Sequence, residues 1–226
     1  MQMLAVPADP ATETWTWSRI SEVSQDEALS AGDIDGDGDL DLLLGTTWLR
    51  NENGASWTPL TLHDGGGLPD RNRLADINAD GKLDAVVGYE AISQPGKLAW
   101  YEQGSSPEEL WTEHLIADPP ITGPMSVDVA DMDGDGDLDV VAGEHNTDNP
   151  DQAALYIFEN ADGKGMDWVR HVVYEGDEHH DGAQVADIDG DGDLDILSIG
   201  WTHNRVLLYE NQGAEAPNGG FKLYLP

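Results

Sequence analysis

Four short aspartate-rich segments recur along the chain with the same spacing between their carboxylates. They read DIDGDGDLD, DINADGKLD, DMDGDGDLD and DIDGDGDLD, at residues 33–41, 76–84, 131–139 and 187–195. Side-chain oxygens at the first, third and fifth positions can converge on one point if the chain turns sharply, which a glycine at the sixth position permits. Ca²⁺ takes about six to eight oxygen ligands in an irregular cage. The spacing therefore predicts a Ca²⁺ site in each loop.

The odd-numbered positions of each loop are the expected ligands, with the seventh contributing its backbone carbonyl. They are Asp33, Asp35, Asp37, Asp39, Asp41; Asp76, Asn78, Asp80, Lys82, Asp84; Asp131, Asp133, Asp135, Asp137, Asp139; and Asp187, Asp189, Asp191, Asp193, Asp195. The second loop has a neutral Asn78, so we expect weaker binding there. Mg²⁺ prefers a strict octahedron and Zn²⁺ prefers nitrogen and sulfur ligands, which favours Ca²⁺. We expect up to four structural ions, because the crowded carboxylates of each loop repel one another without metal.

Each loop is embedded in a repeated unit of short apolar segments. The loops begin at residues 33, 76, 131 and 187, so successive starts lie 43, 55 and 56 residues apart. Every loop leads into an apolar stretch that ends in glycine: LDLLLG (40–45), LDAVVG (83–88), LDVVAG (138–143) and LDILSIG (194–200). Units of four strands and roughly 40–55 residues are typical of β-propeller blades. We therefore predict an all-β protein of four-stranded antiparallel blades, four of them carrying calcium loops.

The number of outer strands bears on whether the blades close into a ring. The outer-strand pattern occurs at residues 57–62, 111–116 and 168–173, and WTWSRI (15–20) and FKLYLP (221–226) look like two more copies. Four loops with five outer strands do not fit a simply closed four-bladed ring. We predict an N-terminal tail at residues 1–14 and propeller repeats at 15–226, forming an arc of a larger propeller or one that associates to complete itself. A small closed ring with one redundant strand is the alternative.

The composition excludes several classes of partner. The formal net charge is −35, from 45 acidic and 10 basic residues, whereas a nucleic-acid partner needs a basic surface. No run approaches the roughly 20 apolar residues of a membrane span, and the chain has no cysteine. Residues 1–15 lack a basic stretch followed by an apolar one, so we expect any secretion signal to lie outside this sequence.

The loop D-x-D-G-D-G-x-x-D and the apolar stretch after it resemble the FG-GAP or VCBS repeat, over residues from about 15 to 226. The resemblance implies a β-propeller, usually of seven blades, with Ca²⁺ in the blade loops. It also implies a secreted, extracellular or periplasmic location. Members include integrin α-subunit heads, sugar-binding lectins, polysaccharide lyases and sugar dehydratases. Only four loops are present here, which departs from the seven-bladed pattern.

Residues that break the repeat are the candidates for ligand binding. His114 and His171 recur at one place in two repeats, which indicates packing, whereas other polar residues differ between repeats. The candidates are Arg73, Glu90, Glu144, His145, His179, His180, Trp201 and His203. An exposed Trp beside His and carboxylates is a common way to build a sugar site.

Three functions are compatible with these residues. The first is a calcium-stabilised extracellular module that binds carbohydrate or another extracellular partner. The second is a carbohydrate-active enzyme of the lyase or dehydratase type, using the His/Glu cluster of the third and fourth repeats, since His can serve as a base near neutral pH. The third is an adhesion or scaffold propeller without glycan binding. A homo-oligomer, or the remainder of a larger propeller, is a further expected partner.

Overall fold

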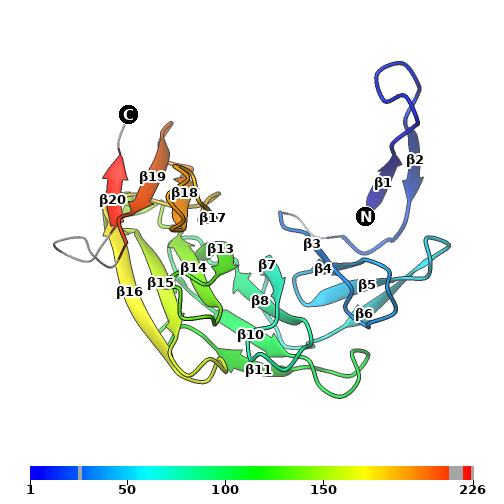
Figure 1. Ribbon diagram of the computed structural model, residues 1–226, viewed down its shortest axis with the longest axis horizontal. Helices are drawn as coiled ribbons and strands as arrows, with labels where there is room; N and C mark the ends of the chain where they lie inside the picture. The colour runs from blue at the N-terminus through cyan, green and yellow to red at the C-terminus, as the bar shows by residue number, and fades with distance from the viewer. Residues whose placement is uncertain (25–26, 214–220, 225–226) are drawn as a thin grey trace.

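Four antiparallel sheets follow one another along an open arc, with the two chain ends far apart (Figure 1). The computed structural model describes residues 1–24, 27–213 and 221–224. Each of the four sheets has four strands, and we call them blades 1 to 4 in chain order. The all-β prediction and the four-stranded blades are confirmed, and the arc is open rather than a small closed ring.

Blades 1 and 2 form the N-terminal part of the arc. Blade 1 consists of β3 (Ser30–Gly32), β4 (Asp41–Leu44), β5 (Thr47–Asn51) and β6 (Trp57–Thr61). Blade 2 consists of β7 (Pro69–Ala75), β8 (Asp84–Tyr89), β10 (Leu98–Glu102) and β11 (Thr112–Leu115). A small extra ladder joins β9 (Pro95–Gly96) to β12 (Ile121–Thr122).

Blades 3 and 4 form the other part. Blade 3 consists of β13 (Pro124–Ala130), β14 (Asp139–Glu144), β15 (Ala154–Asn160) and β16 (Trp168–Glu175). Blade 4 consists of β17 (Gln184–Ala186), β18 (Asp195–Ile199), β19 (Val206–Asn211) and β20 (Phe221–Tyr224). In all four blades the aspartate loop connects the first strand to the second, as the repeat predicts. The predicted outer strand at 221–226 is the fourth strand of blade 4 as far as Tyr224, and residues 225–226 lie outside the described residues.

The hydrophobic core lies between blades, because a single sheet cannot bury both of its faces. Trp48 of blade 1 is fully buried in a cluster with residues of blade 2. Trp100 of blade 2 is fully buried in a cluster with residues of blade 3, among them Phe158. A third cluster, which includes Ile157 and Ile196, lies between blades 3 and 4. Stacking of neighbours is therefore what stabilises each blade.

Polar contacts also connect the first strands of neighbouring blades, which lie nearest to the centre of the arc. The hydroxyl of Ser30 donates to the carbonyl of Asn72 at 3.0 Å, joining blades 1 and 2. The Arg73 Nε lies 2.8 Å from the carboxylate of Asp128, joining blades 2 and 3. The other oxygen of Asp128 accepts the backbone N–H of Val185 at 2.8 Å, joining blades 3 and 4. Arg73 therefore has a structural partner on the neighbouring blade.

A two-stranded hairpin precedes blade 1. β1 (Gln2–Ala5) pairs with β2 (Thr16–Arg19), so the residues expected to form a tail at 1–14 contain a strand. The hairpin continues the curve of the arc, with β1 on the side that faces its centre (Figure 1). The expected outer strand at 15–20 thus corresponds to β2, and it pairs with β1 rather than with a strand of the four blades.

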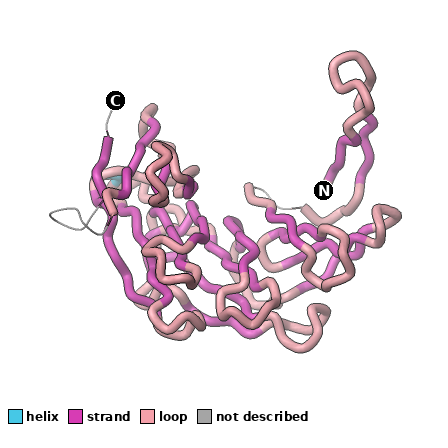
Figure 2. The backbone as a smooth tube through the Cα atoms, in the orientation of Figure 1, coloured by secondary structure: helices cyan, strands magenta, loops and turns pink. Residues whose placement is uncertain are grey.

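Strands and loops make up nearly all of the described chain (Figure 2). Within the described ranges the only helix is a 3₁₀ turn at Pro150–Gln152. Among these residues, no helix is long and apolar enough to cross a membrane.

Candidate calcium sites and a second polar cluster

All four aspartate loops share one backbone shape. In the first loop Gly36 and Gly38 have φ angles of 75° and 97°, a region that side chains with a Cβ disfavour. The third and fourth loops repeat this with glycines at the same two positions. In the second loop Ala79 has a φ of 57° where the others have glycine, so this loop holds an alanine in the left-handed region. The glycines are therefore required by the turn itself.

Hydrogen bonds from the backbone to the loop carboxylates repeat in the same way. In the third loop, Asp131 Oδ2 accepts the N–H of Gly136 at 3.1 Å, and Asp133 Oδ1 accepts the N–H of Asp135 at 3.1 Å. The same two bonds, between the same loop positions, occur in the first, second and fourth loops. Because the backbone donors fold each loop around its own side chains, the carboxylates face a common centre.

The ninth-position aspartate braces each loop against the strands. Asp139 is 1% exposed, and its two oxygens accept the backbone N–H groups of Met132 and Asn160, both at 2.9 Å. The equivalent bonds are made by Asp41, Asp84 and Asp195. This residue therefore connects the loop to the third strand of its own blade, in addition to the metal-ligand role that the spacing predicts.

Burial makes the charged form of these aspartates unfavourable in the absence of a cation. Desolvation raises the pKa of Asp84 to about 7 and that of Asp139 to about 6, although backbone hydrogen bonds oppose the shift. Burial likewise raises the pKa of Asp35 and Asp133, and neighbouring carboxylates add to the rise. A bound cation would relieve both effects, because it replaces the lost solvation and neutralises the repulsion.

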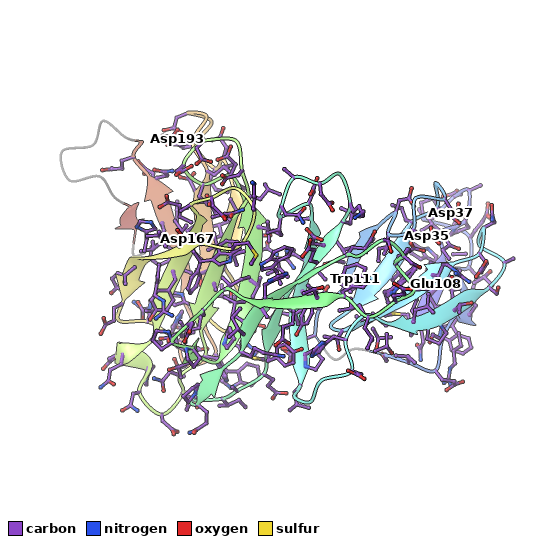
Figure 3. All side chains as sticks on the ribbon, turned by 90° about the horizontal axis from the view of Figure 1, so that it is seen from below. Asp35, Asp37, Glu108, Trp111, Asp167 and Asp193 are labelled. Carbon is purple, nitrogen blue, oxygen red and sulfur yellow. The ribbon has the colours of Figure 1, made fainter. Side chains whose placement is uncertain are left out.

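Three loops gather carboxylate oxygens closely enough for one ion. Ligand atoms within 4.8 Å of one another come from Asp33, Asp35 and Asp37; from Asp131, Asp133 and Asp139; and from Asp187, Asp189 and Asp195. Figure 3 labels Asp35 and Asp37 of the first loop near one end of the arc and Asp193 of the fourth loop near the other. Three carboxylate oxygens in these loops, on Asp33, Asp39 and Asp137, are buried and accept no hydrogen bond. Oxygen-only donors with unused, buried lone pairs fit a hard cation such as Ca²⁺.

The second loop differs in its electrostatics. The Lys82 ammonium lies 2.9 Å from Asp80, whose pKa is lowered because the hydrogen bonds and charge of Lys82 outweigh the effect of burial. The amide of Asn78 keeps its Oδ1 toward the loop, where it accepts the N–H of Asp80 at 3.0 Å. The expectation that this site is the weakest of the four is consistent with a lysine charge next to one of its ligands.

The cluster expected to form an exposed patch in the third and fourth repeats is instead mostly internal. Glu144, His145 and His179 are 5%, 4% and 0% exposed. The carboxylate of Glu144 accepts the backbone N–H groups of Thr122 and Ala154 at 2.7 and 3.0 Å, so it fixes the local fold. These residues are buried because they lie where neighbouring blades meet, a contact that the sequence repeat does not reveal.

His179 and Glu178 lie in the connection between β16 and β17. His179 Nδ1 is 2.8 Å from the Ser198 hydroxyl, and burial lowers the pKa of His179 to about 4. Glu178 Oε1 lies 2.5 Å from His145 Nδ1, and its other oxygen accepts the N–H of Trp201 at 2.5 Å. Burial alone would raise the pKa of Glu178, but the bonds from His145 and the backbone outweigh it and the pKa is lowered. Glu178 therefore holds the β18–β19 connection in place.

Arg71 is the centre of a second polar cluster, close to the centre of the arc. Its Nη2 lies 2.6 Å from Glu27 and 2.8 Å from Asp181, and its Nε donates to the carbonyl of Met125. This one guanidinium on blade 2 thus contacts the segments that lead into blades 1 and 4, as well as blade 3. Sequence reasoning missed Arg71. Its counterparts five residues before the other loops are Ala28, Ser126 and Gly182, so a comparison of the repeats at this position could have found it.

Trp201 and His180 border this cluster. Trp201 is 71% exposed, and its ring meets that of His180 edge-on, with 5.4 Å between ring centroids. His180 Nδ1 lies 2.8 Å from Asp181. His180, Asp181 and Glu27 bring ligand atoms within 4.8 Å of one another, but the Arg71 cation already bridges the two carboxylates. In this cluster the cation between the two carboxylates is therefore Arg71.

The two candidates not yet described are His203 and Glu90. His203 is half-buried, and its Nε2 donates to the backbone carbonyl of Glu178 at 3.1 Å. Glu90 is exposed, and its backbone N–H donates to the carbonyl of Leu68. Of the eight candidates, the structure brings together Glu144, His145, His179, His180, Trp201 and His203, while Arg73 and Glu90 lie on blade 2.

Repeated four-stranded blades with an aspartate loop after each first strand define a β-propeller-type repeat protein. Residues 76–142 match the family description "FG-GAP-like repeat", and residues 27–58 match "FG-GAP repeat". Together the two matches support the assignment of this chain to the FG-GAP repeat family. A search of curated proteins found no significant match.

Proposed function

We propose that this chain is a calcium-stabilised β-propeller module that acts outside the cell as a binding module. The observation that carries the proposal is the convergence of three carboxylates in each of three loops, to within 4.8 Å. In the first loop one of these carboxylates, that of Asp33, also has a buried oxygen that accepts no hydrogen bond. The FG-GAP assignment supports the proposal, because acidic loops of this kind recur in that family. The ions would be structural, since each cage is built from residues of a single loop.

Metal content tests this proposal directly. After equilibrium dialysis against Ca²⁺ at pH 7.5, metal analysis should find at least three ions per chain, with a fourth at higher concentration from the weaker second loop. An excess of Mg²⁺ should not displace them, because Mg²⁺ requires a stricter octahedron than these loops offer. A chain that retains no Ca²⁺ after dialysis would contradict the proposal.

The exposed side chain of Trp201 favours carbohydrate as the class of ligand. Trp201 offers an exposed aromatic face, and the exposed carboxylate of Asp181 near it can accept hydrogen bonds from sugar hydroxyls. His180 and Arg71 are themselves buried and orient Trp201 and Asp181 from below. The burial of His179 and Glu144 confines this candidate site to fewer residues than the sequence suggested. A carbohydrate-active enzyme of the lyase or dehydratase type would have to work with the residues around Trp201, because His179 is not accessible to a polymer.

We expect Trp201→Ala to abolish glycan binding while the fold is retained. The matched control is Trp17→Ala, which removes an exposed indole (55% exposed) from the N-terminal hairpin. Binding is measured on a glycan array with the wild type and both variants, and each glycan that binds is checked for cleavage by mass spectrometry. Product formation would favour the enzyme, whereas no binding to any glycan would favour an adhesion or scaffold role.

The arc also supports a proposal about the rest of the propeller. The inner edge of β1 faces the centre of the arc and pairs with no other described strand. Several apolar side chains of the hairpin are exposed, among them Leu4 at 55% and Trp17 at 55%. An unpaired strand edge with exposed apolar residues favours association, so further blades or a second copy would complete the sheet.

A further inference from the structure

A tryptophan that blades 1 and 2 share is replaced by an isoleucine in blade 3, at the junction with blade 4. In each blade one backbone N–H at the end of the third strand donates to the ninth-position aspartate. The residues that donate are Asn51, Gln103, Asn160 and Asn211. Three residues before this donor, blades 1 and 2 have Trp48 and Trp100, both fully buried against the next blade. Blade 3 has Ile157 at this position, facing blade 4. The large ring that fills the first two junctions is therefore missing from the third.

A groove lies at the corresponding place. A cavity of about 800 Å³ opens between blades 3 and 4, and Ile157, Val173, Met132 and Leu194 form its apolar wall. The equivalent space in the second junction is filled by Trp100, which lies against Ile77 and Gly165 and donates from Nε1 to the Gly165 carbonyl at 2.8 Å. An isoleucine is far smaller than an indole, so among the described residues this part of the third junction is filled less than its counterpart in the second.

A histidine that stacks on the tryptophan in blade 2 is retained in blade 3. His114 pairs across the strands with Trp100, and their rings stack with 4.5 Å between centroids and 21° between planes. His171 pairs in the same register with Ile157, so its ring has no indole to stack on. Its side chain is 51% exposed, against 17% for His114. The sequence-based expectation that both histidines are packing residues therefore holds for His114 but not for His171.

The ring of His171 is nevertheless held in place. His171 Nε2 lies 2.6 Å from Glu159, as His114 Nε2 lies 3.0 Å from Glu102. The carboxylate thus orients the imidazole at the edge of the groove, in the way that blade 2 orients its own histidine against an aromatic ring. Blade 3 keeps the carboxylate and the histidine of this arrangement but lacks the ring between the blades.

We propose that this groove binds a planar aromatic ligand, whose ring takes the place that Trp48 and Trp100 occupy in the other junctions and stacks on His171. The site is separate from the second polar cluster around Arg71 and Trp201, but it adjoins the third candidate calcium site, because Asp131, Asp133 and Asp139 also line the groove. Apolar cavities in proteins take up aromatic molecules of matching size, even without polar partners. No tryptophan, tyrosine or phenylalanine is present among the described residues that line the groove, so the imidazole of His171 is the ring available there for stacking.

Charge around the groove restricts the ligand further. Glu159 and Asp193 border it, Asp131 and Asp133 line it as expected ligands of Ca²⁺, and the chain as a whole carries a formal net charge of −35. A neutral or cationic aromatic is therefore favoured over an anionic one. Indole and tryptamine are suitable probes, with indole-3-acetate as the anionic comparison.

The test uses the full chain in saturating Ca²⁺, with binding measured by calorimetry and by ligand-observed NMR. Indole and tryptamine should bind the wild type, and indole-3-acetate should bind more weakly. Ile157→Trp restores the residue type of the other junctions and should weaken binding of the probes at least about tenfold, a difference near 1.4 kcal/mol. Leu115→Trp adds an indole at an exposed position on blade 2 and should leave binding unchanged. His171→Ala should weaken binding less than Ile157→Trp, because it removes one face of the site only.

Chemical-shift mapping on the labelled wild type locates the probe even if Ile157→Trp fails to fold, and the smaller Ile157→Phe gives a second test of filling. Shifts confined to β15, β16, the third and fourth aspartate loops and the end of β19 support the proposal. Absence of probe binding to the wild type overturns it, as do shifts elsewhere or equal affinity for the wild type and the folded filled variant.

Discussion

Replacement of Asp139 by alanine is expected to lower the free energy of unfolding even when calcium is absent, by less than the roughly 3–6 kcal/mol of its two hydrogen bonds, because the substitution also removes a carboxylate that burial disfavours. The estimate follows from two lost hydrogen bonds to a charged group, each worth about 1.5–3 kcal/mol. The N–H groups of Met132 and Asn160 would be left buried and without their acceptor. In saturating Ca²⁺ the loss should be larger, because the third loop would no longer bind its ion.

Denaturant unfolding, with and without chelator, separates the two contributions. With chelator, the loss of unfolding free energy measures the hydrogen bonds of Asp139 between the loop and the strands. The additional loss in Ca²⁺ measures the contribution of the bound ion. A site occupied at a hundred times its Kd contributes about 2.7 kcal/mol, which sets the size of that additional loss. Asp148→Ala, at an exposed acid outside the loops, is the matched control and should change neither arm. Equal loss in both arms would show that Asp139 is structural and does not bind a cation.

Replacement of Trp100 by alanine is the second large effect. Trp100 is fully buried between blades 2 and 3, donates to the Gly165 carbonyl, and stacks on His114. Removal of a buried tryptophan side chain costs about 3–5 kcal/mol, because the apolar contacts are lost and the cavity closes only in part. In a molecule whose core lies between blades, this loss should loosen the junction rather than one blade alone.

The control for Trp100 is Trp201→Ala, which removes an indole that is 71% exposed and should change stability by no more than about 0.5 kcal/mol. Hydrogen exchange would show whether amides of β10 and β15 lose protection together in Trp100→Ala. Loss of protection in β10 alone would contradict the interpretation that stacking between blades stabilises them.

Much of the fold can be predicted from the sequence because the repeat gives the positions of the strands. The nine-residue loops fix where each first strand ends and each second strand begins, and the apolar stretches after them become β4, β8, β14 and β18. The glycines with positive φ lie at the positions where the turn requires them. The open arc was also expected from a count of five outer strands on four loops, although one of the five, β2, pairs with β1 and not with a blade.

The candidate ligand patch was harder to predict, because a residue that breaks a repeat can do so for structural reasons. His179 and Glu144 differ from their counterparts in other repeats, yet both are buried where blades meet. Burial at a junction depends on the neighbouring blade, and a comparison of repeats within one chain contains no information about that neighbour. Of the candidates in the third and fourth repeats, only Trp201 is exposed.

Two features could have been found by a finer comparison of the repeats. Arg71 replaces small residues at its position and, with Glu27 and Asp181, ties the four blades together near the centre of the arc. Ile157 replaces the tryptophans of the first two blades and leaves the groove beside it. Both substitutions lie in strands, where the repeats resemble one another less closely than in the aspartate loops.

The central claim is that calcium stabilises this arrangement of blades, and thermal unfolding with and without a calcium chelator tests it most directly. We expect the melting temperature to fall clearly on chelation, to recover fully when Ca²⁺ is restored, and to recover only in part with Mg²⁺. The reason is that three loops gather buried carboxylates that repel one another when no cation is present. A melting temperature that is the same with Ca²⁺ and with chelator would contradict the claim.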